Sequence, residues 1–180
     1  MTSSITPQIK NILPDLLNEY SDLIPADSKS TVLNYSGQDG LKQVTLNSLT
    51  AKNELVIFEI GTMSSFLDYD FSEKVRKIFV DKKIKVREIT NHDSQDPWTQ
   101  VEEFVKKFWD CRYINPQTLK IDIETLVYND TVALYSYKNG HIFCVEIRNP
   151  NLAKMQKQMF DFVWSQAKKL KIGPGGSTSL

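Results

Sequence analysis

The most constraining feature of the sequence is the apolar run LVIFEI at residues 55–60. A short run of branched and aromatic side chains predicts a strand that is covered on both faces. Another strand-like run precedes it at residues 31–35 and a third follows at residues 85–89, each separated from it by a stretch with helical spacing. Alternating strands and helices of these lengths predict parallel strands with right-handed crossovers.

The second half of the chain predicts antiparallel strands instead. Three strand-like runs lie at residues 120–128, 132–137 and 141–147, joined by Asn129-Asp130 and by Asn139-Gly140. An Asn-Gly pair between two such runs is a strong signal for a hairpin. We therefore expect an α/β domain with a mixed sheet of about six strands, flanked by helices.

The two ends of the chain differ from its centre. Residues 1–29 contain an amphipathic helical pattern and a linker, whereas residues 173–180 have no apolar periodicity. We expect an N-terminal helix and linker at 1–29, an α/β domain at 30–172 and a disordered tail at 173–180. The apolar spacing within the domain predicts two further helices, at residues 97–109 and 150–170.

Charge and cysteine content disfavour several classes of protein. The 22 lysine and arginine residues equal the 22 aspartate and glutamate residues, so we expect no direct binding to nucleic acid or to a membrane. Cys111 and Cys144 are the only two cysteines, and we expect both to be buried in a reducing compartment. The opening MTSSITPQIK lacks the segments of a secretory signal, which predicts a cytoplasmic protein.

Motifs for catalysis or metal binding are absent from the sequence. It contains no GxGxxG, Walker phosphate loop, GxSxG or CxxC, and His92 and His141 have no metal-ligand spacing. We therefore predict no metal, no cofactor and no catalytic residue. His92 is expected in a solvated polar loop, although either histidine could contact a ligand.

A resemblance to a known family begins at residues 33–43. Tyr35 ends a strand, a turn with Gly37 follows, and residues 40–43 (GLKQ) open a helix that leads into LVIFEI. This order resembles the C-terminal effector domain of TrmB-type transcription regulators, and the similarity in element order spans residues 30–170. It implies a phospholipase D-like half fold and a sensing role. The residues before the first strand are too few for the family's winged helix, so transcription regulation would require a partner.

The resemblance also offers a test for catalysis. Active phospholipase D-type folds carry HxKxxxxD at the start of a strand hairpin, with histidine as the nucleophile and lysine holding the phosphate. If Asn129 takes the aspartate position, Asp122 and Glu124 stand in place of the histidine and the lysine. Two like charges near 4 Å repel by about 4 kcal/mol at an effective dielectric of about 20, so carboxylates here would oppose a phosphodiester. A cleft that carries these carboxylates in place of the catalytic residues would suit a neutral or cationic ligand. The alternative is that Asp122 and Glu124 are simply exposed on the strand.

Two hypotheses about function follow. The first is a non-catalytic ligand-sensing or protein-interaction module, paired with a second copy or a helix-turn-helix protein, with a small molecule at the C-terminal ends of the parallel strands. Its expected ligand-binding residues are Glu59, Gly61, Thr62, Glu124 and Asn129. The alternative is a degenerate or unfamiliar enzyme that uses Glu59 or Glu124 as a general base. That reading requires a carboxylate with a raised pKa in a concave, largely apolar pocket.

Overall fold

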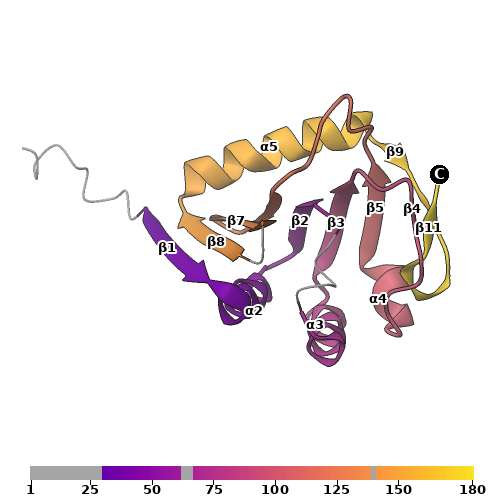
Figure 1. Cartoon of the computed structure of the whole chain (residues 1–180), viewed down its shortest axis with the longest axis horizontal. Helices are drawn as coiled ribbons and strands as arrows, with labels where there is room; N and C mark the ends of the chain where they lie inside the picture. The colour runs from indigo at the N-terminus through magenta and orange to yellow at the C-terminus, as the bar shows by residue number, and fades with distance from the viewer. Residues whose placement is uncertain (1–29, 62–66, 139–140) are drawn as a thin grey trace, which may run out of the picture. The chain divides into compact units, whose positions relative to one another are not determined.

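The computed structural model describes residues 30–61, 67–138 and 141–180. The N-terminal helix expected in residues 1–29 lies outside this part of the chain. The described residues form a mixed eight-stranded sheet, with helix α5 on one face and helices α2, α3 and α4 on the other (Figure 1). This arrangement confirms the predicted α/β class and mixed sheet, with eight strands in place of about six.

The parallel part of the sheet consists of β2, β3 and β5. Their bounds are Glu54–Glu59, Lys85–Thr90 and Trp109–Tyr113. Helix α3 (Tyr69–Asp81) connects β2 to β3, and helix α4 (Glu102–Lys107) precedes β5. The Asp68 carboxylate begins α3 by accepting a hydrogen bond from the Phe71 backbone N–H at 2.8 Å.

The antiparallel part contains β6, β7, β8 and β1, and β6 pairs directly with β2. The bounds are Glu124–Tyr128, Thr131–Lys138, His141–Arg148 and Thr31–Ser36. The prediction that the first strand runs parallel to its neighbours is wrong, because β1 is the edge strand and pairs antiparallel with β8. Its residues alternate between exposed and half-buried, which suits an edge better than a strand covered on both faces. Helix α2 (Gly37–Ser48) follows it.

Strand β2 is buried on both faces, as the LVIFEI run predicts. Leu55 and Ile57 belong to the core beneath α2, α3 and α4, and Val56 belongs to the core beneath α5. On the α5 side the Phe58 ring meets the Phe160 ring edge to face, with centroids 5.2 Å apart. Helix α5 (Pro150–Gln166) starts at Asn149, whose side chain accepts from the Leu152 N–H.

Two expectations about helices are wrong. The helix predicted for residues 97–109 is limited to α4, and Trp109 instead opens strand β5. The helix predicted to reach residue 170 ends at Gln166, after which β9 (Lys168–Lys169) pairs with β5. In both places aromatic and apolar residues at helical spacing are buried by a strand's neighbours instead of by a helix face.

The tail differs from the expected disorder. Strands β10 (Lys171–Ile172) and β11 (Thr178–Ser179) form a small sheet with β4 (Ser94–Gln95), and the 3-10 turn Pro174–Gly176 joins them. The Trp98 indole N–H donates to the Gly176 carbonyl at 2.7 Å, and the backbone N–H groups of Trp98 and Thr99 donate to the Gly175 carbonyl. Backbone hydrogen bonds and glycines that accept positive φ, at +65° and +78°, order this tail without any apolar periodicity.

Candidate functional site

A cavity of about 120 Å³ lies between the sheet and the helices on its α3 side. The wall is mostly apolar and is built by β2, β3, β6 and α3. Its apolar residues include Leu55, Ile57, Val75, Phe79, Val86 and Leu126. Arg76 of α3 also lines the cavity, but it is paired with Glu73 at 2.6 Å and lies over the Trp98 ring.

Three glutamates from neighbouring strands converge on this cavity. Glu59 is the last residue of β2, Glu88 lies in β3, and Glu124 is the first residue of β6. Alternation along β2 places Glu59 on the same face as Leu55 and Ile57. The pairing of Ile57 with Glu88 and of Phe58 with Thr125 then brings all three carboxyl groups to one end of the sheet.

Hydrogen bonds hold each carboxyl group in place. Glu124 accepts from the Ile60 backbone N–H at 2.9 Å and from the Tyr135 hydroxyl. Glu88 accepts from the Trp109 indole N–H at 3.3 Å. It also accepts from the Cys111 thiol at 3.5 Å.

Glu59 is linked to its neighbours on β3. It accepts from the Thr90 hydroxyl and shares a hydrogen bond with Glu88. A hydrogen bond between two carboxyl groups requires a proton on one of them. No ion pair of the described residues includes Glu59, Glu88 or Glu124.

The environment raises the pKa of all three carboxyl groups. Burial, followed by the charge of Glu59, raises the pKa of Glu124 from 4.5 to about 8. Burial and the charges of Glu59 and Glu124 raise the pKa of Glu88 well above its usual range. Burial also raises the pKa of Glu59, although Thr90, His92 and Glu88 act in the opposite direction. Glu124 is therefore largely protonated at pH 7, and the cluster can donate hydrogen bonds as well as accept them.

The structure brings some of the expected ligand-binding residues together and separates others. Glu59 and Glu124 share the cavity, and Gly61, with φ of +76°, follows β2 at the same edge. Thr62 lies outside the described residues. Asn129 lies at the opposite end of β6, where its side chain accepts from the Lys52 N–H at 3.1 Å and donates to the Thr50 carbonyl at 2.9 Å.

The two residues of the degenerate motif have different environments. Asp122 is 67% exposed and pairs with Lys120 at 3.0 Å, so it is a surface residue. Glu124 is 1% exposed and lines the cavity, so the interpretation of both residues as exposed is wrong for Glu124. The position that the resemblance assigns to the phosphate-binding lysine is thus occupied by a buried carboxyl group.

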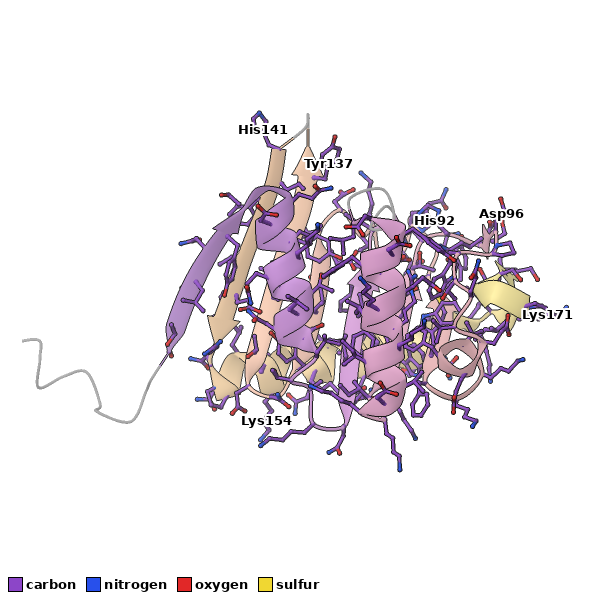
Figure 2. The ribbon with its side chains drawn as sticks, turned by 90° about the horizontal axis from the view of Figure 1, so that it is seen from below. His92, Asp96, Tyr137, His141, Lys154 and Lys171 are labelled. Atoms are coloured by element: carbon purple, nitrogen blue, oxygen red, sulfur yellow. The ribbon has the colours of Figure 1, made fainter. Side chains whose placement is uncertain are left out.

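Sequence reasoning missed Glu88 and gave no role to His92. The available signal for Glu88 was a charged residue within KVREI, which is predicted as a strand beside the central one. A carboxyl group on the inward face of such a strand needs hydrogen-bonding partners. His92 is exposed, as expected for a loop, but its imidazole packs so closely on Gly61 that a Cβ atom there would overlap it. Its backbone N–H donates to the Thr90 hydroxyl oxygen at 3.2 Å. His92 therefore lies at the edge of the sheet that carries the carboxyl groups (Figure 2).

Comparison with solved structures identifies the fold. The chain is similar to TrmBL2, an archaeal chromatin protein, with a TM-score of 0.52 and 18% identity over 89% of this chain and 62% of TrmBL2. It is also similar to Nuc, a phospholipase D family member from Salmonella typhimurium, with a TM-score of 0.53 and 12% identity over 78% of this chain and 98% of Nuc. NucT from Helicobacter pylori gives the same score and identity. The chain therefore has a phospholipase D-like α/β fold.

Comparison of the sequence gives no match of this kind. No protein-family model matches it, and no curated protein does. The chain spans about 62% of the length of TrmBL2. At these identities the likeness concerns the fold, and the role of the cavity has to be argued from its own residues.

The described residues lack two further features. No group of three or more histidine, cysteine, aspartate or glutamate side chains there is arranged to hold a metal ion. Among the described helices, none has both the length and the apolar character that a membrane span requires.

Proposed function

We propose that the chain is a non-catalytic effector-sensing module that binds a small molecule with an apolar body and a hydrogen-bonding or cationic head. The observation that carries this proposal is the set of three carboxyl groups on the wall of a mostly apolar cavity, none of which forms an ion pair among the described residues; the Arg76 guanidinium in the same wall is paired with Glu73. A few polar groups that converge in an apolar pocket are typical of small-molecule sites. The resemblance of residues 33–43 to the effector domain of TrmB-type regulators supports sensing as the role.

The size of the cavity limits the ligand. A dry cavity of roughly 150 Å³ accommodates benzene, and this one measures about 120 Å³. A compound of about five or six heavy atoms fits such a space. Larger sugars and nucleotides would require the helices to move away from the sheet.

The charge of the cluster favours an amine over an acid. An ammonium group beside a carboxyl group favours the ionised carboxylate, so binding would release a proton from Glu124. An alcohol would bind without proton release, because protonated carboxyl groups can donate to it and accept from it. A carboxylate ligand would meet electrostatic repulsion from any ionised member of the cluster.

Three compounds of one shape test the proposal: isobutylamine, isobutanol and isobutyrate. We expect the amine to raise the melting temperature most, with a larger shift at pH 8.5 than at pH 6.5, and isobutyrate to have no effect. A ligand at 100 times its dissociation constant adds about 2.7 kcal/mol of stability. The matched variant Glu124→Gln should lose the pH dependence of the amine shift. Equal shifts with all three compounds, or none with any, would reject the proposal.

The regulatory part of the proposal concerns partners. TrmBL2 is described as a chromatin protein with a novel mode of DNA binding. By analogy, we propose that ligand binding in this chain changes its association with a second copy or with a helix-turn-helix protein. Light scattering with and without isobutylamine would detect a ligand-dependent change in the homodimer.

An enzymatic role is the second candidate, because the structure meets the condition that it requires. Glu124 lies in a concave, largely apolar cavity and has a pKa of about 8, which suits a general acid near neutral pH. NMR spectra of isobutylamine and isobutanol incubated with the protein test this role. Consumption of either compound, abolished by Glu124→Gln, would favour an enzyme over a sensor.

A further inference from the structure

A second, larger groove lies at the end of the sheet where the parallel strands β2, β3 and β5 begin. Its volume is about 1350 Å³, and it is lined by the first residues of these three strands, by α4 and by the segment from β9 to the 3-10 turn. The charged side chains in its wall comprise six basic and three acidic residues. The groove therefore concentrates positive charge in a chain whose formal net charge is zero.

The lysines come from three separate stretches of sequence. These stretches are DKKIK at residues 81–85, VKKF at 105–108 and AKKLK at 167–171. The fold gathers them on one groove, which is lined by Lys85, Lys106, Lys107, Lys169 and Lys171. Because the stretches are far apart along the chain, their convergence is a property of the fold.

Most of this positive charge faces solvent. Lys85, Lys169 and Lys171 are exposed and belong to no ion pair in the part of the chain that the structure describes. Lys106 and Lys107 pair with Glu102 and Glu103 along α4, but their side chains are 69% and 65% exposed. Exposed pairs of this kind are weak, so both lysines can exchange a carboxylate for another anion.

The arginine and two of the three acidic side chains of the groove have partners of their own, whereas a buried carboxylate oxygen of the third, Asp110, has none among the described residues. Arg87 donates to Glu54 and to Asp161, and Lys157 also pairs with Glu54 at 3.0 Å. The Glu102 carboxylate accepts from the Gly175 N–H at 2.7 Å as well as from Lys106. These contacts hold the paired side chains in place, so the exposed lysines are the groups that can bind a partner.

We propose that this groove binds the phosphate backbone of double-stranded DNA without reading its sequence. Lysines act as point charges for phosphates, and such contacts position a protein on nucleic acid without discriminating between bases. Of the aromatic rings in the wall, Trp109 is buried in the core and Phe108 is half-buried against it, so they offer no open platform on which an unpaired base could stack.

The shape of the groove and its apolar residues distinguish DNA from a lipid surface. A protein that binds a membrane interface inserts exposed apolar side chains beside its basic ones. Val86, Val105 and Leu170 line this groove but are buried, Phe108 and Ile172 are half-buried, and Pro174 is the one exposed apolar residue of its lining. A concave wall lined by exposed lysines fits a strand backbone better than a flat bilayer.

A second groove continues the basic edge. Its volume is about 430 Å³, it contains Lys52, Lys154 and Lys157, and it shares Glu54 with the larger groove. Figure 2 shows Lys154 at the end of the strands opposite His92 and Lys171 at the far side of the sheet. A DNA backbone of several nucleotides could therefore follow this edge.

Fluorescence anisotropy with a labelled 30-base-pair duplex of arbitrary sequence tests the proposal on the full chain. At 50 mM salt we expect binding with a dissociation constant of roughly 1 to 100 µM, the range of sequence-independent binding. The affinity should fall as salt rises. The triple variant Lys85→Gln, Lys169→Gln, Lys171→Gln should bind at least tenfold more weakly, with a salt dependence flatter by about one unit per lysine.

A matched control variant carries Lys42→Gln, Lys74→Gln and Lys120→Gln, which remove the same charge from positions that do not line the groove. It should bind DNA within about twofold of the unchanged protein. An equal loss in both variants would assign binding to overall charge and overturn the proposal. Binding to phosphatidylserine vesicles but not to the duplex would overturn it in favour of a membrane partner. Melting temperatures of both variants check that they fold.

Discussion

The two ends of the parallel strands contrast in how they hold charge. At the C-terminal end, Glu59, Glu88 and Glu124 surround a small apolar cavity and have raised pKa values. At the N-terminal end, lysines such as Lys85 and Lys107 are exposed around an open groove. Buried charge is expensive and is neutralised by protonation, whereas exposed charge is inexpensive and remains available. The first end is suited to a small molecule and the second to a large polyanion.

The largest effect should come from truncation of Glu124 to alanine. This change leaves the Ile60 N–H and the Tyr135 hydroxyl without their buried acceptor, and each unsatisfied donor costs about 1 to 3 kcal/mol. We expect Glu124→Ala to lower the free energy of unfolding by about 3 kcal/mol in urea denaturation. Glu124→Gln, which mimics the protonated carboxyl group, should cost less than about 1 kcal/mol. Equal losses in both variants would mean that Glu124 acts as an ionised group.

Stability should also fall as the pH rises. The folded state raises the pKa of Glu124 from 4.5 to about 8, so between these values it binds more protons than the unfolded state. The stabilising contribution of the protonated form is complete below pH 4.5 and is lost as the pH rises through about 8. We expect the free energy of unfolding to fall steadily over this window, measured by urea denaturation at several pH values. The curve of Glu124→Gln should be flatter, and an equally steep curve would contradict the assignment.

Substitution of Asn129 should have an intermediate effect on stability. It tests whether this residue has a structural or a ligand-binding role. Its φ of +47° and its two hydrogen bonds to the loop before β2 predict that Asn129→Ala costs about 1 to 2 kcal/mol. The melting shift produced by isobutylamine should be unchanged, because Asn129 lies at the other end of the strand. Loss of that shift in a variant of unchanged stability would restore Asn129 as a ligand-binding residue.

The smallest effect on stability should come from the lysine groove. Lys169→Ala removes an exposed side chain with no ion pair among the described residues, so the free energy of unfolding should change by less than about 0.5 kcal/mol. Urea denaturation beside Glu124→Ala gives the comparison directly. A loss above about 1 kcal/mol would show that this lysine stabilises the fold. The two ends of the strands would then not differ in this respect.

The sequence predicted the elements whose periodicity is strong. LVIFEI identified the central strand, and the Asn129-Asp130 turn identified the hairpin between β6 and β7. It failed where local pattern and tertiary environment disagree. Residues before Trp109 have helical spacing, yet pairing with β3 places Trp109 in a strand. The glycine-rich tail carries no side-chain pattern, and its order depends on backbone contacts with Trp98 that only the fold provides.

The candidate site was predictable in part for a similar reason. Glu59 and Glu124 could be expected at one edge because each borders a strand, whereas Glu88 required knowledge of which face β3 turns inward. The groove was hidden by the zero net charge, which averages over the whole surface. The repeated Lys-Lys pairs at residues 82–83, 106–107 and 168–169 were the available signal, and only the sheet topology brings them together.

The buried carboxyl groups also affect how the protein moves in an electric field. The formal charge of zero treats every glutamate as ionised. In the folded chain Glu124 is largely neutral at pH 7 and the pKa of Glu88 is raised, so the native molecule carries more positive charge than the unfolded chain. The isoelectric point therefore depends on the fold as well as on the composition. Native and denatured samples at neutral pH should separate on electrophoresis by charge as well as by size.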